Sequence, residues 1–327
     1  MKLLKIAVLF GGKSAEREVS LATGREMINA LLGLGHEVAG IDLITDHFLE
    51  NLQSFHPDIV LIGLHGRLGE DGTVQGALEL LGYPYVGSGV LASALAIDKS
   101  MTKSILSATG VPVAKEVVIE RVHAKKQMSP HFFEKLGETL GWPLIIKPNR
   151  EGSTIGLTLA HNETEAKVGL ELALRYDSHV LIEQYIRGTE VTVALTGDAN
   201  DPMILGVIEI VPKAELYDYE SKYQTGGSKH IIPARLKPVF MEQIIDFSKK
   251  AYTAIHCEDY ARIDFIVNTQ GPVVLEVNTL PGMTPTSLVP DAAKAKGMAF
   301  PDFLFGLVQQ AYERAKTTRE LKNHSSI

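Results

Sequence analysis

The chain has 327 residues, of which 45% are hydrophobic and 22% charged, proportions typical of a globular protein. Its formal net charge is -7 at pH 7, so it lacks the overall basic character of most nucleic-acid-binding proteins, and no apolar run reaches the ~18 residues of a membrane-spanning helix. We therefore expect neither nucleic acid nor membrane as a partner. The single cysteine, Cys257, cannot form an internal disulfide, which favours a buried thiol in a reducing, cytoplasmic compartment.

The first hundred residues alternate short apolar runs with helical patterns. They predict strands at 5–10, 37–42 and 58–64, with a helix that ends near Gly33 between the first two. The N-terminal run resembles a secretory signal, but the segment GGKSAERE follows it in place of a small-residue cleavage site, so we interpret the run as a strand. Strand–helix–strand alternation indicates a parallel sheet with right-handed crossovers.

After the first hundred residues the pattern changes to α+β. A polar stretch at 217–229 precedes a terminal helix predicted at 301–315. Further strands are expected at 115–119, 143–147, 157–160, 180–185, 190–195 and 204–210. We predict an open parallel α/β domain at 1–98, followed by two α+β parts at 99–189 and 190–327.

Two glycine-rich turns resemble nucleotide-binding motifs but lack essential parts of them. GGKS at 11–14 ends like a P-loop, but Ala7 stands where that motif requires its first glycine. GSGVLA at 87–92 is in the wrong place for a first βα turn, and no acidic residue follows about 20 positions later at a strand end. We interpret both as turns that begin helices, and an NAD-dependent oxidoreductase is therefore disfavoured.

The segment 261–279 predicts a β-hairpin with a three-residue loop at 269–271. Counting back from this loop places Asp264 opposite Glu276, and two facing carboxylates repel each other unless a proton or a cation lies between them. A divalent ion with oxygen ligands removes the conflict, and Asn278 adds a carbonyl oxygen. The alternative is a solvated polar face. Alternation places Arg262, Asp264, Glu276 and Asn278 on one face of the hairpin and Val273, Leu275 and Val277 on the other.

A magnesium ion held by few carboxylates usually also contacts substrate phosphates, which makes ATP the expected partner. Lys147 ends an apolar strand and precedes the loop NREGSTIG, whose glycines and hydroxyls suit backbone donation to phosphate. Lys99, Arg150 and Lys222 are further candidates, although a solvated surface charge is the alternative for each of them.

A series of motifs extends over about residues 4–315. The motifs are GGKSAEREVS (11–20), HGRLGEDGTVQG (65–76), KPNREGSTIG (147–156), YDYESKY (217–223), RIDF (262–265) and EVNTLPGMTPTSLVP (276–290). In this order they resemble the motifs of the D-alanine–D-alanine ligase family of the ATP-grasp superfamily. The resemblance implies a two-part ATP-grasp fold after the N-terminal domain. It also implies a homodimer and a role in peptidoglycan precursor synthesis.

This resemblance implies that ATP lies between two antiparallel sheets, with Lys99 and Lys147 at its phosphates and Glu190 at its ribose. The adenine ring would contact the linker residues Glu183, Gln184, Tyr185 and Ile186 and lie between Leu216 and Leu275. Two Mg²⁺ or Mn²⁺ ions would be held by Asp264, Glu276 and Asn278.

The implied reaction phosphorylates the carboxylate of one D-alanine, and the amine of a second D-alanine then displaces phosphate from the acyl phosphate. Glu16 would bind the first ammonium group beside His65, although helix-dipole stabilisation and an ordinary loop histidine are the alternatives. Arg262 and the Gly282 N–H would form the oxyanion site, and Ser287 would bind the carboxylate of the second D-alanine. Ser153 and Tyr223 would form hydrogen bonds that lead to Glu16. Lys222 would assist Tyr223 in accepting a proton.

The polar stretch 217–229 would close as a lid that shields the acyl phosphate from water, or it is a surface loop. Tyr223 stands where ester-forming relatives carry a histidine, so the amide product is expected. D-Serine as second substrate, a different ATP-grasp carboxylate–amine ligase and a non-catalytic ATP-binding regulatory protein are the alternatives.

Overall fold

The structure is a computed structural model that describes residues 2–44, 47–123, 129–212, 228–284 and 286–324. None of the helices in these ranges combines the length and apolar character that crossing a membrane requires. Three predicted site residues and most of the predicted lid lie outside the described residues: Leu216, Lys222, Tyr223 and 217–227.

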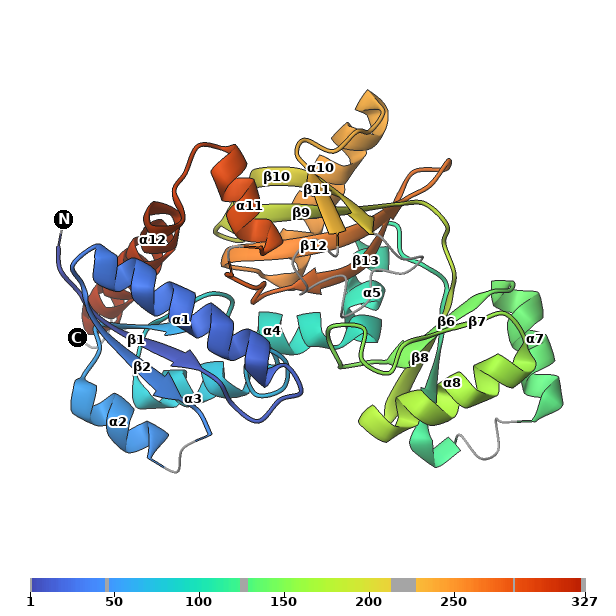
Figure 1. The fold of residues 1–327 in the computed structure, drawn as a ribbon, viewed down its shortest axis with the longest axis horizontal. Coiled ribbons are helices and arrows are strands. Elements are labelled where there is room, and N and C mark those ends of the chain that lie inside the picture. Colours follow the sequence, from blue (N-terminus) through green and yellow to red (C-terminus); the bar gives the residue numbers. More distant parts are fainter. Residues whose placement is uncertain (1, 45–46, 124–128, 213–227, 285, 325–327) are drawn as a thin grey trace.

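The N-terminal part is a parallel four-stranded sheet in the order β2–β1–β3–β4. Its strands are β1 (Lys5–Phe10), β2 (Glu37–Asp42), β3 (Ile59–Ile62) and β4 (Tyr85–Val86), and its helices are α1 (Arg17–Gly33), α2 (Phe48–Phe55), α3 (Thr73–Leu81) and α4 (Val90–Ile97). The first two strands have the predicted bounds, whereas β3 is shorter than predicted. The terminal helix α12 (Phe300–His324) returns to pack beside α1 (Figure 1) and is longer than predicted.

The central part is an antiparallel four-stranded sheet. In spatial order its strands are β5 (Glu116–Glu120), β8 (His179–Gln184), β6 (Leu144–Pro148) and β7 (Thr158–Ala160). The helices α7 (Pro130–Leu140) and α8 (Glu163–Tyr176) cover one face, where Leu144 and Ile146 are fully buried. Since side chains alternate along a strand, Lys147 points to the opposite, uncovered face.

The C-terminal part is an antiparallel five-stranded sheet that lies between the other two parts in Figure 1. Its strands in spatial order are β11 (Ser228–Ile231), β10 (Met203–Pro212), β9 (Thr189–Gly197), β12 (Asp259–Val267) and β13 (Pro272–Asn278). The helices α10 (Pro238–Ile255) and α5 (Lys99–Ala108) pack on the face that buries Ile263. The helix α11 (Leu288–Ala295) packs against β9 and β10.

The hairpin of β12 and β13 places Asp264 opposite Glu276, as predicted, but the predicted loop is wrong. Val267 pairs with Pro272, so the loop has one residue more than expected. A β-bulge next to Asp264 compensates for this shift, and Leu275 is the extra residue of the bulged strand.

The bulge also corrects the predicted faces of β13. Val274, instead of Val273, joins Val277 in the core. Leu275 and Glu276, which were expected on opposite faces, both line one pocket. A local change in alternation therefore gives the pocket both an apolar and an acidic side chain.

Cys257 is fully buried, and this burial raises the pKa of its thiol to about 12. The prediction that it is a core residue is therefore confirmed. Two sheets fall within the predicted domains 1–98 and 99–189, and the third falls within 190–327 except for Thr189, the first residue of β9. The domain boundaries themselves stay a prediction.

Candidate active site

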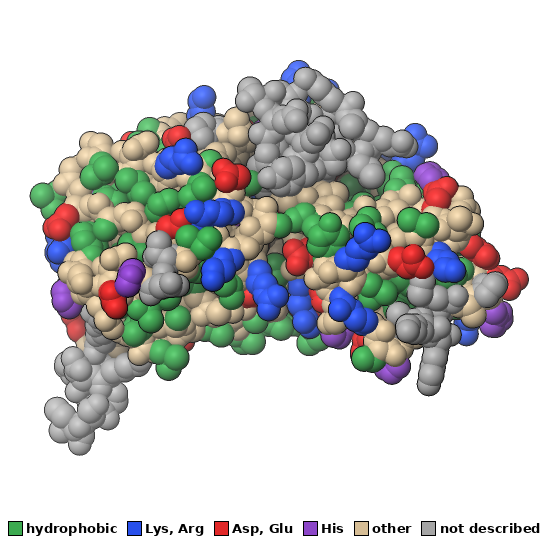
Figure 2. All heavy atoms as spheres, turned by 60° about the horizontal axis from the view of Figure 1, so that its bottom comes forward, with side chains coloured by type: hydrophobic (Ala, Val, Ile, Leu, Met, Phe, Trp, Pro, Cys, Tyr) green, Lys and Arg blue, Asp and Glu red, His purple; other side chains and the backbone are tan. Residues whose placement is uncertain are grey.

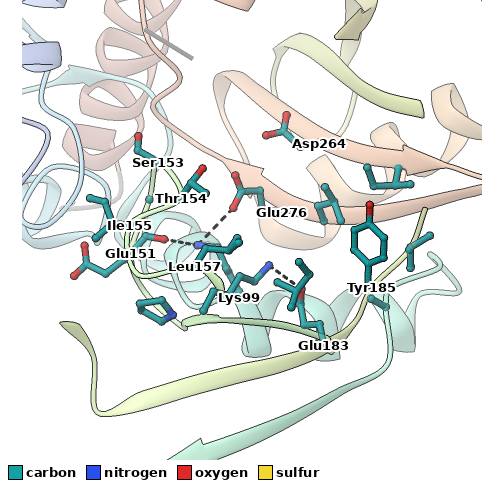
Figure 3. A pocket seen from close by; sticks show the side chains of 18 of the residues that line it. Lys99, Glu151, Ser153, Thr154, Ile155, Leu157, Glu183, Tyr185, Asp264 and Glu276 are labelled. Atoms are coloured by element: carbon teal, nitrogen blue, oxygen red, sulfur yellow. Dashed lines mark hydrogen bonds and ion pairs between the residues drawn. The ribbon is translucent and has the colours of Figure 1, made fainter. Parts of the chain in front are cut away.

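A pocket lies between the uncovered face of the central sheet and the C-terminal sheet (Figure 3). It receives Lys147 from β6, Glu183 from β8, Asp264 from β12 and Glu276 from β13. The predicted nucleotide-binding residues that line it are Lys99, Lys147, Glu183, Gln184, Tyr185, Ile186, Glu190 and Leu275. The fold thus gathers in one place residues that are far apart in the sequence.

Lys99 occupies the first turn of α5, because the Asp98 carboxylate accepts a hydrogen bond from Met101 N (3.1 Å) and caps the helix there. Its ammonium group donates to the carbonyl oxygen of Glu151 (2.8 Å) and lies 3.5 Å from Glu276 Oε2. Lys99 therefore connects the loop after β6 with the acidic strand β13 (Figure 3).

Lys147 forms an ion pair with Glu183, with Nζ 2.9 Å from Oε2. Burial alone would lower the pKa of Lys147, but the carboxylates of Glu183 and Glu276 outweigh burial and raise it. The side chain is thus a cation whose present partner is an internal carboxylate.

The loop after β6 adopts an uncommon backbone conformation. Ser153 and Thr154 have φ values of 50° and 65°, a left-handed region that non-glycine residues rarely occupy and that is often found at functional sites. The hydroxyl group of Ser153 donates to the Glu16 carboxylate. The turn therefore points the Ser153 side chain across to the N-terminal part.

A second pocket adjoins the first, and the two share Gly152, Ser153 and Glu276. The residues predicted to bind the amino-acid substrates, Glu16, His65, Arg262 and Ser287, line this second pocket, as do the predicted catalytic residues Ser153 and Gly282. The structure therefore places the two predicted sets of ligand-binding residues next to each other.

Glu16 is the N-cap residue of α1, but its side chain makes no capping hydrogen bond. Glu16 is 5% exposed, and its carboxylate accepts the hydrogen bond from Ser153 that the family resemblance implied. Two glycines allow the backbone to approach it closely, since a Cβ atom at Gly66 or Gly152 would lie 2.9 or 3.0 Å from Glu16 Oε2. The ligand-binding role implied for Glu16 stays a prediction.

His65 is buried, and side chains contact both of its ring nitrogens. Nε2 lies 3.0 Å from Thr23 Oγ1, and Nδ1 lies 3.3 Å from Glu70 Oε1. The tautomer of the ring decides which nitrogen donates and which accepts in these two contacts. Glu70 was not predicted as a site residue, although it belongs to the motif HGRLGEDG.

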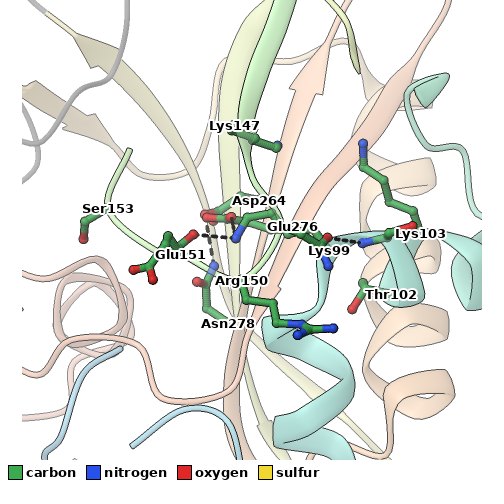
Figure 4. Close-up of polar contacts among 12 residues, drawn as sticks. Lys99, Thr102, Lys103, Lys147, Arg150, Glu151, Ser153, Asp264, Glu276 and Asn278 are labelled. Carbon is green, nitrogen blue, oxygen red and sulfur yellow. Dashed lines mark hydrogen bonds and ion pairs between the residues drawn. The ribbon is translucent and has the colours of Figure 1, made fainter. Parts of the chain in front are cut away.

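Arg262 donates two hydrogen bonds to Asp264, from Nε to Oδ1 and from Nη2 to Oδ2, both 2.9 Å long. The Thr192 hydroxyl (2.5 Å) and Asn278 Nδ2 (3.2 Å) donate to the same carboxylate. Figure 4 shows Asp264, Glu276 and Asn278 close together at the hairpin. Thr192, which belongs to none of the motifs, was not predicted.

The donor set at the hairpin suits a hard divalent cation. Asp264 and Glu276 face each other across the strands, and Asn278 can offer an amide oxygen. Among the described residues, no three His, Cys, Asp or Glu side chains are close enough to hold a metal ion by themselves. An ion at this place would therefore need oxygen ligands from a phosphate or water as well.

Ser287 is the N-cap residue of α11, as the sequence predicted for a residue near a helix start. Its hydroxyl accepts a hydrogen bond from Thr284 N (3.0 Å) and lies 2.8 Å from Thr284 Oγ1. A Cβ atom at Gly282 would approach Ser287 Oγ to 2.9 Å. The absence of a side chain at Gly282 therefore leaves room for the Ser287 hydroxyl. Thr284 was not predicted.

A third cavity, of about 730 Å³, lies behind the loop after β6, and Glu151 lines both this cavity and the first pocket. Its charged lining residues are Arg67, Asp71, Asp98, Arg121, Arg150, Glu151, Arg175 and Asp177. Figure 2 shows basic side chains gathered near the middle of one face, with acidic side chains among them. Because the two signs balance, the cavity does not have the character of a strongly cationic site.

The fold and the first pocket together define the class. Two antiparallel sheets that face each other across a pocket lined by two lysines and five acidic side chains, attached to a parallel α/β unit, are the architecture of an ATP-grasp protein. Models described as the C-terminus and the N-terminus of D-ala D-ala ligase match residues 105–309 and 44–88. The chain belongs to the D-alanine–D-alanine ligase family.

Named relatives agree with this assignment. A D-alanine–D-alanine ligase of Halalkalibacterium halodurans is 50% identical over 92% of this chain and 97% of its own, and one of Pelotomaculum thermopropionicum is 45% identical over 97% and 99%. The ligase from Bacillus anthracis in complex with ATP has a TM-score of 0.82 at 34% identity, covering 96% of this chain and 99% of its own. The VanG D-Ala:D-Ser ligase of Enterococcus faecalis has a TM-score of 0.78 at 30% identity, covering 95% and 100%.

Proposed function

We propose that this protein joins two D-alanine molecules into D-alanyl-D-alanine and converts ATP to ADP and phosphate. The observation that carries this proposal is the pair of adjoining pockets that meet at Gly152, Ser153 and Glu276. A nucleotide in the first pocket would direct its terminal phosphate toward a carboxylate in the second. Membership of the family supports the same reaction.

The first step activates the donor. A free carboxylate is a poor electrophile, so the γ-phosphoryl group is transferred to one carboxylate oxygen to form an acyl phosphate and ADP. This transfer needs mainly positioning and charge neutralisation. Lys99 and Lys147 line the pocket and would contact the phosphates. Without a nucleotide, Lys99 is paired with Glu276 and Lys147 with Glu183.

Asp264, Glu276 and Asn278 are the residues that would hold Mg²⁺ or Mn²⁺. A bound ion would supply further neutralisation of phosphate charge. The hairpin supports this assignment through the opposed carboxylates. The number of ions, two in the family resemblance, stays a prediction.

The second step forms the peptide bond. The amine of the second D-alanine attacks the acyl carbon, and phosphate leaves. Glu16 would hold the ammonium group of the first D-alanine, Arg262 and the Gly282 N–H would stabilise the developing oxyanion, and Ser287 would bind the second carboxylate. The roles of Tyr223, Lys222 and the lid concern residues outside the described ranges and stay predictions.

D-Serine is a second candidate for the acceptor. Thr284, Thr286 and Ser287 line the second pocket, and hydroxyl groups there could pair with a substrate hydroxyl. A D-Ala:D-Ser ligase is also among the similar structures. A cytoplasmic location, a homodimer and a place in peptidoglycan precursor synthesis stay predictions.

The test is direct detection of the dipeptide by mass spectrometry. Purified protein is incubated with ATP, Mg²⁺ and D-alanine, in parallel with L-alanine, D-serine and D-lactate as partners. We expect D-alanyl-D-alanine as the main product. Product only with D-serine as acceptor would favour the second candidate, and ATP binding without any product would indicate a regulatory protein.

A further inference from the structure

Four buried or largely buried charged side chains form a cluster at the nucleotide pocket: Lys103, Glu116, Lys147 and Glu183. Lys103 is 2% exposed and Glu183 3% exposed. Lys103 comes from α5, which packs on the C-terminal sheet. Glu116, Lys147 and Glu183 belong to β5, β6 and β8 of the central sheet. The cluster therefore connects the two sheets that enclose the pocket.

Glu116 and Glu183 are direct neighbours across β5 and β8. Two carboxylates in such a position repel each other, and Lys103 relieves the repulsion because its ammonium group donates to Glu183 and lies 3.2 Å from Glu116 Oε2. Burying a lysine is costly unless it is paired. If Lys103 had only a structural role, it would do no more than neutralise Glu116 and Glu183.

Glu183 differs from Glu116 because each of its two oxygens has its own lysine. Oε1 accepts from Lys103, and Oε2 lies 2.9 Å from Lys147 Nζ. Burial alone would raise the pKa of Glu183, but Lys147 and Lys103 outweigh it and lower the pKa. Glu183 is therefore held as a fixed carboxylate and not as a neutral acid.

Glu183 lies at the end of the pocket opposite the turn after β6 (Figure 3). Figure 3 shows Glu183 and Tyr185 at one end of the pocket and the Ser153–Thr154 turn at the other. If the phosphates bind near the turn, Lys147 turns toward them and leaves Glu183 Oε2 without its lysine at the end where the base lies. An ionised carboxylate oxygen can only accept hydrogen bonds, so it suits a base with an amino group and repels one with a carbonyl oxygen.

We propose that Lys103 is a positioning residue for base selection: it fixes the Glu183 carboxylate, so that the oxygen released by Lys147 accepts a hydrogen bond from the exocyclic amino group of a 6-aminopurine. The proposal rests on the proposed nucleotide site. It gives the two lysines of the cluster different tasks, since Lys147 exchanges its partner for phosphate while Lys103 keeps its own.

The experiment compares the binding of ADP and of IDP, whose base has a carbonyl oxygen in place of the amino group, by calorimetry with Mg²⁺ and the full chain. A hydrogen bond to a charged acceptor corresponds to a preference for ADP of about 10-fold or more. In Lys103→Met the ratio of ADP to IDP affinities should fall to about threefold or less. Lys103→Arg keeps the positive charge and should retain part of the preference for ADP. Lys147→Met should weaken both nucleotides and keep the preference.

The exposed Lys249→Met variant on α10 is the matched control and should behave like the unaltered protein. If Lys103→Met does not fold, Lys103→Gln provides the same readout. An unchanged ratio of ADP to IDP affinities in the folded Lys103 variants would overturn the proposal, as would the absence of any preference in the unaltered protein. Because binding needs no D-alanine, failure of dipeptide synthesis is a separate outcome.

Discussion

The two adjoining pockets are built in different ways. In the nucleotide pocket, Lys99 and Lys147 are paired with the internal carboxylates of Glu276 and Glu183. In the second pocket, the Glu16 carboxylate is enclosed by close backbone and a serine hydroxyl. The first pocket therefore holds lysines that are paired with internal carboxylates, whereas the second holds a carboxylate that is also enclosed by shape. Substitutions of charged residues and of glycines should separate the contributions of charge and of shape.

The largest effect is expected at the acidic hairpin. The double variant Asp264→Asn and Glu276→Gln removes both opposed carboxylates, so we expect turnover and its dependence on divalent ions to disappear. The measurement is phosphate release with D-alanine over a range of Mg²⁺ concentrations. Normal metal-dependent turnover would contradict the metal site.

Replacing Arg262 should be the next most damaging change. Loss of one donor to a developing oxyanion typically lowers the rate about 10²–10³-fold, so Arg262→Met should reduce kcat by about that factor. Because Arg262 also donates to Asp264, Mg²⁺ dependence should be measured with it. A decrease in the apparent affinity for ATP alone, with normal kcat, would contradict an oxyanion role.

Glu16→Gln should act on one substrate only. Loss of a charge-assisted hydrogen bond of about 1.5–3 kcal/mol should raise the KM for D-alanine about 10–100-fold. The KM for ATP should change little because Glu16 lines only the second pocket. Steady-state kinetics with each substrate varied gives the answer, and an equal effect on both substrates would break the distinction between the pockets.

Gly66→Ala should produce a smaller effect of the same kind through shape. Gly66 has a φ of 69°, and the new methyl group would lie 2.9 Å from Glu16 Oε2. We expect a raised KM for D-alanine together with modest destabilisation, measured by thermal unfolding. Gly82→Ala is the matched control, since its φ of 74° is similar but nothing lies within 4 Å of the new methyl group; it should destabilise without changing the KM.

The smallest effect concerns the support of α1. Arg17 donates to Asp42 and lowers the pKa of that carboxyl to about 2. Because the pKa is lower in the folded state, this stabilisation is present above the ordinary pKa of about 4 and is lost as the pH falls from about 4 to 2. Asp42→Asn should lower the Tm at pH 7 but much less at pH 2, and an equal difference at both pH values would contradict the pairing.

Much of the fold was predictable because short apolar runs and helical periodicity already indicate strands and helices. The strands at 5–10 and 37–42 are examples, since their apolar runs are bounded by turn residues. The hairpin shows the limit of this reasoning. Its loop was predicted one residue too short, and Asp264 still faces Glu276 only because a bulge at Leu275 cancels the error. Bulges depend on packing against neighbouring strands, which one sequence does not reveal.

The candidate site shows a similar division. Residues within the motifs, such as Glu16 and Arg262, were identified from the sequence and lie together in the structure. Thr192 and Lys103 were not assigned a role, because their importance comes from contacts made between separate elements, Thr192 with Asp264 and Lys103 with Glu183. Such partners become visible only when the sheets are assembled.

The most direct test of the account is the stoichiometry of the reaction with ATP, Mg²⁺ and D-alanine. The account predicts one D-alanyl-D-alanine for each ADP and each phosphate formed, and no product after the metal is chelated. ATP consumption without dipeptide, or dipeptide formation that continues without a divalent ion, would contradict it.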